Sequence, residues 1–165
     1  MIHALFATGL KGEMGMSDGT LPWRTKDNRI RKDLPSHIQE QCEKDMALFK
    51  SLTTGNIMIM GYNTYRTFPS PLPGRINIVI DRNCGTKDNK KCSIFASEES
   101  FHDKWFFFPT LEEAISLCKE HFPEKEIYVI GGPKLLKEAF SKKLIDGKTY
   151  HTVIDAEFPE AEVYL

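Results

Sequence analysis

The fold is decided by the stretch GNIMIMGYNTYRTFPSPLPGRINIVIDR, residues 55–82. It holds two short apolar runs, at 57–60 and 76–80, which glycine and proline bound. Such runs are typical of buried strands, and the piece between them is too long for a tight hairpin. A strand, a crossover with room for a short helix and a second strand form the unit of a parallel sheet. Ligands of such sheets bind beyond the carboxyl ends of the strands, here at 61–64 and 81–82.

The length and the charge of the chain indicate one ordinary globular domain. Its 165 residues are enough for a compact domain with a hydrophobic core. The 22 Lys and Arg residues nearly balance the 23 Asp and Glu residues, so no nucleic-acid surface is expected. No basic segment precedes an apolar stretch at the start, and no apolar run approaches the roughly 18 residues of a membrane span. We therefore expect a cytoplasmic monomer that acts on a small molecule, without a nucleic-acid or membrane partner.

The four cysteines, Cys42, Cys84, Cys92 and Cys118, do not indicate a disulfide framework or a zinc site. None of them forms a C-x-x-C pair, the spacing typical of such sites. Cys84 and Cys92 with His102 are candidate metal ligands, but unrelated loop residues are the favoured interpretation. No bound metal is expected.

Hydrophobic patterns predict further elements on both sides of residues 55–82. Thr110 opens a T-x-x-E capping box, and the apolar residues after it form one helical face that Pro123 ends. A polar loop follows Arg82, with a short strand expected at 93–96. The other predicted strands span residues 2–8, 105–108, 126–130 and 148–155, and the predicted helices span residues 111–122 and 134–140.

A loop punctuated by glycine follows the first predicted strand and ends in Leu21-Pro22-Trp23. Its glycines, Gly9, Gly12, Gly15 and Gly19, indicate a mobile segment. The spacing is not the dinucleotide fingerprint G-x-G-x-x-G, because no clear helix follows. Taken alone, the tryptophan is typical of a core anchor after a turn.

Asp45 is the acidic residue with the most informative surroundings. It shares one face of a predicted helix with Met46 and Phe49. A carboxylate on an apolar face is unusual, since burying an unpaired charge costs several kcal/mol. The alternative is an exposed aspartate near a helix N-terminus, which the helix dipole favours. Asp33 is a competitor, but Pro35 follows it closely and no phenylalanine stands four residues on.

The segment 24–44 is strongly charged and contains Pro35. We expect a short helix near residues 36–43, with Ser36 as its N-cap. The favoured interpretation of the whole segment is a solvated excursion without a catalytic role.

The predicted strand at 126–130 runs into Gly131-Gly132-Pro133 and then into a helix. Small residues admit a phosphate group, and the free N–H groups of a helix N-terminus bind it. Proline suits the first helical turn. The pattern indicates a phosphate cradle, although the three residues alone are a weak signal.

In combination, these motifs resemble the dihydrofolate reductase family. The strongest match is IMG at 59–61, Thr64 three residues on, and PLPGRIN at 71–77. The loop from Met14-Gly15-Met16 to Pro22-Trp23 resembles the family's active-site lid. Together with the acidic helix, the IGG strand and the last strand, the resemblance covers nearly the whole chain in family order.

The resemblance implies an α/β fold: a mostly parallel, doubly wound sheet flanked by helices, in one domain over residues 1–165. Family members pass from the tryptophan to the catalytic helix in a few residues, so residues 24–44 form an insertion. Typical members continue into a further antiparallel strand, so the C-terminal end of this chain is shortened.

The resemblance also implies a reaction, hydride transfer from NADPH to 7,8-dihydrofolate, which gives tetrahydrofolate. It assigns the catalytic carboxylate to Asp45, a hydrogen bond to that carboxylate to Thr152, and a place in the lid to Trp23. The implied substrate contacts are Leu5, Phe49, Leu72 and Arg75. The implied NADPH contacts are Ala7, Met14, Gly15, Gly61, Tyr62, Asn63, Thr64, Asp81, Arg82, Ile130, Gly131, Gly132, Pro133 and Lys134.

Two alternatives stay open at this point. The related reductase of riboflavin synthesis shares the fold and NADPH, but Asp45 together with Arg75 in a PLPGR turn favours folate. A non-catalytic structural or ligand-binding relative is the other alternative, because of the insertion and the short C-terminus.

The chain departs from the family pattern where the 2′-phosphate of NADPH is expected. A basic residue is common after the IMG glycine, and here it is Tyr62. Asp81 follows the next strand, where its charge would repel a phosphate, and Arg82 compensates only in part. We therefore expect weaker discrimination between NADPH and NADH than is usual in the family.

Overall fold

The computed structural model describes residues 1–83 and 104–165. The strand expected at 93–96 and the residues Cys84, Cys92 and His102 lie outside the described residues.

The centre of the described structure is a six-stranded parallel sheet. Its strands are β1 (Ile2–Thr8), β3 (Ile57–Gly61), β4 (Ile76–Ile80), β5 (Trp105–Phe108), β6 (Ile127–Gly131) and β7 (Thr149–Val153). They lie in the order β5-β4-β3-β6-β1-β7. The apolar runs of the sequence predict all six strands, and the expected α/β fold is confirmed.

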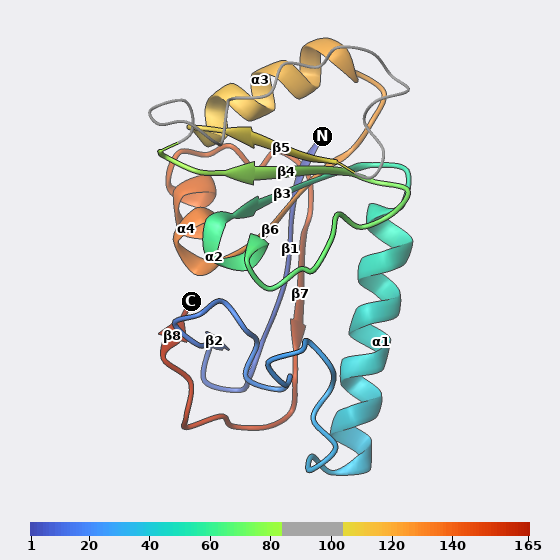
Figure 1. Ribbon diagram of the computed structural model, residues 1–165, viewed down its shortest axis with the longest axis vertical. Coiled ribbons are helices and arrows are strands. Elements are labelled where there is room, and N and C mark those ends of the chain that lie inside the picture. Colours follow the sequence, from blue (N-terminus) through green and yellow to red (C-terminus); the bar gives the residue numbers. More distant parts are fainter. Residues whose placement is uncertain (84–103) are drawn as a thin grey trace.

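Alternating side chains divide the core between the two faces of the sheet. Ile57 and Ile59 point to the face that α3 (Leu111–His121) and α4 (Pro133–Ser141) cover, whereas Met58 and Met60 point to the opposite face, towards Phe49 of α1 (Ser36–Thr53). Figure 1 shows α1 on the other side of the sheet from α4. The helices are α1 (Ser36–Thr53), α2 (Tyr62–Tyr65), α3 (Leu111–His121) and α4 (Pro133–Ser141). Helices therefore flank both faces, as in a doubly wound fold.

Local sequence signals explain where two of the helices begin. The Thr110 hydroxyl accepts a hydrogen bond from the backbone N–H of Glu113 at 3.2 Å, which confirms the predicted cap of α3. Pro133 is the first residue of α4, where its missing N–H costs no helical hydrogen bond.

The prediction of a helix at residues 36–43 is correct in its start but wrong in its length and its cap. α1 runs from Ser36 through 18 residues without interruption, so the short helix expected at 36–43 and the helix of Asp45 are one element. The helix contains no glycine or proline that would break it. Pro35 occupies the N-cap position without a side-chain hydrogen bond, and Ser36 is the first helical residue rather than the cap.

The inner face of α1 carries Asp45 in the middle of an apolar stripe. Ile38 and Cys42 are buried in one core cluster, and Phe49 is partly buried against another. Asp45 lies between them at helical spacing, roughly two and a half turns from the start of the helix. The alternative of an exposed aspartate at the helix N-terminus therefore does not apply.

A small second sheet orders part of the glycine-punctuated loop. β2 (Glu13–Gly15) pairs antiparallel with β8 (Val163–Tyr164). The buried carboxylate of Glu13 accepts hydrogen bonds from the backbone N–H groups of Lys11 and Phe158. The sequence analysis missed both strands, because two or three residues are too few to show a hydrophobic period.

Trp23 is fully buried, in a core cluster on the α1 side of the sheet. Its ring centroid lies 5.6 Å from that of Phe158, and Ile38, Cys42 and Ile154 belong to the same cluster. This position fits the core anchor that the sequence alone favours.

Replacing Trp23 by alanine should lower the free energy of unfolding by about 3–5 kcal/mol, because the packed surroundings close only part of the resulting cavity. Leu10→Ala is the control; its side chain is 51% exposed, and the change should stay below about 0.5 kcal/mol. Urea unfolding of both variants measures the difference. Similar small losses in the two variants would contradict the assignment of Trp23 as a core anchor.

Candidate active site

A cavity of about 870 Å³ opens at the carboxyl ends of β1, β3 and β6. This volume is within the usual range of small-molecule sites. After β3 the chain continues to β4, towards one edge of the sheet. After β6 it continues to β7, at the opposite edge. The cavity thus lies at the switch point where open α/β sheets bind ligands.

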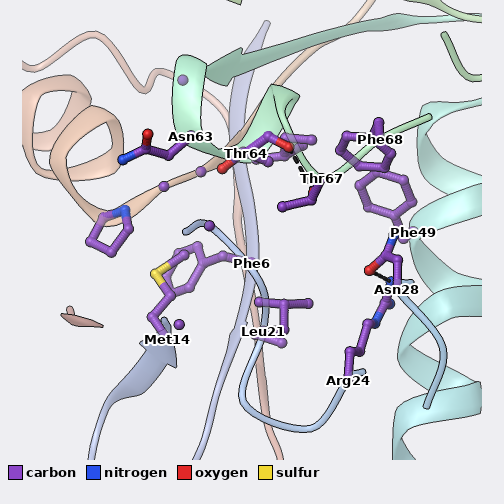
Figure 2. Close-up of a pocket in the computed structure, with 18 of the residues that line it drawn as sticks. Phe6, Met14, Leu21, Arg24, Asn28, Phe49, Asn63, Thr64, Thr67 and Phe68 are labelled. Carbon is purple, nitrogen blue, oxygen red and sulfur yellow. Dashed lines mark hydrogen bonds between the residues drawn. The ribbon is translucent and has the colours of Figure 1, made fainter. Parts of the chain in front are cut away.

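The structure brings most of the predicted site residues together around this cavity. Figure 2 shows side chains from β2, α1 and α2 converging on it. The predicted residues that line it are Leu5, Ala7, Met14, Gly15, Asp45, Phe49, Gly61, Tyr62, Asn63, Thr64, Leu72, Arg75, Ile130, Gly131, Gly132, Pro133 and Lys134. The predicted residues that do not line it are Trp23, Asp81, Arg82 and Thr152.

Glycines form the edge of the cavity between β3 and β6. A Cβ atom at Gly61 would lie 3.6 Å from the backbone nitrogen of Gly132, and one at Gly131 would lie 3.5 Å from Cε of Met14. Gly131 also has a φ of 136°, a conformation open to glycine. Since α4 begins at Pro133, the N–H groups of its first turn point towards this edge without helical partners. Small residues beside a helix N-terminus suit the pyrophosphate of a dinucleotide.

The loop between β2 and Trp23 reaches across the cavity to α2. Gly19 has a φ of 94°, and a Cβ atom there would collide with the carbonyl oxygen of Asn63. The backbone of this loop therefore packs directly against the start of α2. The Met16 N–H donates to the carbonyl oxygen of Thr20 at 2.8 Å, which closes the loop on itself.

Asp45 presents a partly buried carboxylate to the same cavity. Burial raises its pKa above the ordinary value, while a hydrogen bond from the Thr152 side chain and the charge of Arg24 act in the opposite direction. An acceptor of this kind, in an apolar surrounding, binds paired N–H donors of a ligand strongly.

Arg75 provides a second charge in the lining of the cavity. Arg75 is only 6% exposed, and burial lowers the pKa of its guanidinium. Its Nε donates to the carbonyl oxygen of Pro73 at 3.0 Å and its Nη1 to the Thr53 hydroxyl at 3.3 Å. Among the described residues no carboxylate forms an ion pair with it, so the guanidinium is suited to an anionic ligand group.

The prediction that residues 24–44 form a solvated excursion is wrong at the start of the segment. Arg24 and Asn28 line the cavity, and Figure 2 shows their hydrogen-bonded side chains near Phe49. The backbone folds into a turn in which Arg24 pairs antiparallel with Ile30. That turn directs two polar side chains inward, which the local charge density of the sequence does not reveal.

Four predicted residues lie away from the cavity wall. Trp23 is in the core, and Thr152 acts on the site through its side chain, which lowers the pKa of the Asp45 carboxyl. Asp81 is 8% exposed, and its carboxylate accepts a hydrogen bond from the backbone of the next turn. The Arg82 guanidinium, on a side chain that is 88% exposed, lies 3.8 Å from a carboxylate of α4. Contacts of these two residues with NADPH stay a prediction.

Several cavity residues were absent from the sequence prediction. Phe6 lies in β1, which is buried at every position, and Phe68 sits in the turn after α2, where no period marks a buried side. One polar residue, Thr67, follows α2 and donates its hydroxyl proton to the carbonyl oxygen of Thr64 at 2.7 Å. The missed residues include Phe6, Arg24, Asn28, Thr67 and Phe68, whereas Met16 and Leu21 lie in the loop that resembles the family's lid.

Comparison with known proteins decides the family. The family model described as dihydrofolate reductase matches residues 1–165. The chain belongs to the dihydrofolate reductase family. The family membership confirms the expected NADPH-dependent dihydrofolate reductase, against both the riboflavin-pathway reductase and a non-catalytic relative.

Curated relatives match this reductase over most of its length. Dihydrofolate reductase of Bacillus subtilis is 32% identical over 138 residues, which are 82% of this chain and 67% of that protein. Dihydrofolate reductase type 8 of Escherichia coli is 28% identical over 163 residues, 90% of this chain and 79% of that protein. Dihydrofolate reductase of Mycobacterium leprae is 31% identical over 142 residues, 84% of this chain and 63% of that protein. Within the described residues, no helix is long and apolar enough to cross a bilayer.

Gly19→Ala should weaken NADPH binding by at least about tenfold, or about 1.4 kcal/mol, because the new methyl group pushes the loop off the backbone of α2. Gly55→Ala is a matched control: its φ is 81°, but no atom lies within 4 Å of the added Cβ. Both variants bear the same backbone strain, so the control should change the dissociation constant less than about threefold. Fluorescence titration with NADPH measures both, and equal effects would contradict the contact.

Proposed function

We propose that the cavity binds NADPH along the glycine edge and 7,8-dihydrofolate beside Asp45, with Asp45 as the catalytic carboxylate. One observation carries this assignment: a partly buried carboxylate and a glycine edge at a helix N-terminus face the same cavity. When bound, NADPH supplies the hydride, and the protein aligns the two rings and manages one proton.

Asp45 would accept two charge-assisted hydrogen bonds, from the pterin amino group and from the neighbouring ring N–H. A single negative charge in an apolar pocket also raises the proton affinity of the ring that it binds. The proton itself would arrive through water admitted by the loop that spans the cavity. Thr152 would hold the carboxylate in place by its hydrogen bond.

The substrate half of the cavity would be shaped by apolar walls and closed by a cation. Leu5, Phe49 and Leu72 would sandwich the pterin and benzoyl rings. Arg75 would bind the glutamate carboxylate of dihydrofolate, since its planar guanidinium matches a carboxylate with two hydrogen bonds.

The cofactor half would be formed by backbone rather than by charge. Gly61 and Gly131-Gly132 leave room that side chains would fill, and Asn63 and Thr64 face the same space from α2. Met14 would contact the nicotinamide from β2. The catalytic role of Trp23, the monomeric state and the cytoplasmic location stay predictions.

Asp45→Asn should cut turnover at least about a hundredfold near neutral pH, or about 2.7 kcal/mol. An amide keeps the shape but cannot offer two anionic acceptors to the pterin. The loss should shrink towards lower pH, where the substrate is already protonated and the missing charge matters less. Steady-state rates from pH 5 to 8 with saturating NADPH test this.

Asp33→Asn is the control for that experiment. Asp33 pairs with Arg31 at 2.6 Å on the surface, away from the cavity, so the variant should behave nearly as the unmodified protein. If the Asp33 variant is inactive and the Asp45 variant active, the assignment of the carboxylate is wrong. If both are active, neither carboxylate is catalytic and the proposed role of Asp45 is wrong.

The preference for NADPH over NADH should be weaker than about a thousandfold, or about 4 kcal/mol, in specificity constant. Tyr62 lines the cavity where a basic residue is common in the family. Tyr62→Arg should raise the preference about tenfold by adding a charge-assisted hydrogen bond to the 2′-phosphate. Tyr62→Gln, which removes the ring without adding charge, is the control. A preference above a thousandfold in the unmodified protein would refute the prediction.

A further inference from the structure

Arg24 reaches the cavity from a turn that the backbone holds firmly. Arg24 and Ile30 form an antiparallel bridge. On the side of the turn, the Thr25 N–H donates to the carbonyl oxygen of Arg29 at 2.8 Å. On the side of the core, the Arg31 N–H donates to the carbonyl oxygen of Trp23 at 3.0 Å. The turn is thus fixed to the buried tryptophan, and the direction of the Arg24 side chain is set by the backbone.

The Arg24 guanidinium is held by Asn28 and is incompletely satisfied. Its Nη1 donates to Oδ1 of Asn28 at 3.0 Å, across the turn (Figure 2). Its Nε is buried and has no hydrogen-bond partner. Every other buried side-chain nitrogen or oxygen of the described residues has one. Burial lowers the pKa of Arg24, but a guanidinium stays charged at any physiological pH. A buried charge with an unsatisfied hydrogen-bond donor is rare in native proteins and usually has a functional or structural reason.

Asp45 is the carboxylate in the lining of the same cavity whose charge interacts with that of Arg24. Both residues line the same cavity, yet among the described ion pairs none joins them. The attraction between the two charges nevertheless favours the ionised form of each. In a pocket with little water, charges interact appreciably beyond contact distance.

The other titratable and charged groups around Asp45 do not provide the same counter-charge. Cys42, one turn earlier on α1, has its pKa raised by burial to about 11 and is neutral below that pH. From β7 the nearest group is the uncharged hydroxyl of Thr152. Arg75 and Lys50 line the cavity too, but Arg75 donates to the Pro73 carbonyl oxygen and the Thr53 hydroxyl, and Lys50 is exposed. The other charged groups on this part of α1 are Glu43 and Lys44, both exposed.

We propose that Arg24 is a positioning residue that keeps Asp45 ionised without occupying its oxygens, and that the turn 24–30 is therefore part of the substrate site. A direct ion pair would use the carboxylate oxygens that the pterin needs. The Oδ1 atom of Asn28 prevents this by holding the guanidinium back. The inference rests on the proposed role of Asp45 as the substrate-binding carboxylate.

The sign of the effect follows from the charge. Removing a nearby cation raises the pKa of every acid beside it, because the protonated form loses no attraction and the ionised form does. Without Arg24, Asp45 should therefore become protonated at a higher pH than in the unmodified protein. The bound substrate should also gain a proton more readily, so the alkaline limb of the activity profile should move to higher pH.

The decisive measurement is a titration of Asp45 in the free protein, by NMR of carboxyl carbons labelled with ¹³C. The Asp45 signal is assigned by its loss in Asp45→Asn. Arg24→Met should raise the pKa of Asp45 by about one unit, whereas Arg24→Lys, which keeps the charge, should restore most of the difference. Circular dichroism and urea unfolding verify that each variant is folded, and Arg24→Gln replaces Arg24→Met if the latter is not.

Asn28→Ala tests the second half of the proposal. Once released, the guanidinium should approach Asp45, which should leave the carboxylate ionised but raise KM for dihydrofolate at least about fivefold with little change in kcat. A purely structural role of the turn would leave the pKa of Asp45 unchanged in all variants.

Two results would overturn the proposal: an unchanged pKa of Asp45 in the neutral Arg24 variants, or equal shifts in Arg24→Lys and Arg24→Met. An unchanged KM in Asn28→Ala would overturn the claim that Asn28 holds the guanidinium back. The titration uses neither substrate nor NADPH. A lack of dihydrofolate turnover in the unmodified protein would thus defeat the proposed function separately from the charge effect.

Discussion

The parallel pairing of β3 with β6 is the constraint on which the site depends. The two strands run in regular register until their carboxyl ends, where the register slips and Met60 lies opposite Gly131. The slip leaves Ile130 without a partner on β3, and Ile130 lines the cavity. An irregularity of this kind ends the pairing and redirects the chain. Gly61 also lies close to Gly132 there, so that the backbone of the two strands meets at the edge of the cavity.

The fold was predictable where a single segment carries its own signal. Each central strand is a short apolar run, and Thr110 marks the start of α3 by a side-chain cap that the structure contains. The length of α1 was not predictable in the same way, because its first half is polar apart from Ile38 and Cys42, and two apolar residues one turn apart are too few to reveal a helical period. The proline at position 35 indicates an end of a helix, and the structure shows that this end is the start of one long helix.

The site was predictable where motif spacing fixes a place on a strand or helix, as for Asp45. It was not predictable where a side chain depends on the path of an irregular segment. Arg24 enters the cavity only because the chain turns back at Asn28, whose φ of 65° is a left-handed conformation that asparagine tolerates. Nothing in the charge pattern of the segment distinguishes this arginine from Arg29 or Arg31, which form ion pairs with surface carboxylates.

The two halves of the cavity are therefore built by different means and respond differently to change. The cofactor half is made by close approach of backbone segments, as at Gly19 and Gly131, so any added side chain alters its shape. The loop that covers it is also fastened at its base, where Glu13 and β8 tie it to the C-terminal segment. The proposed substrate half contains the charged groups of Asp45, Arg24 and Arg75 among apolar walls. A neutral substitution there can leave the shape of the cavity unchanged. It removes a charge that balances the others, and burying the remaining charges then costs more free energy.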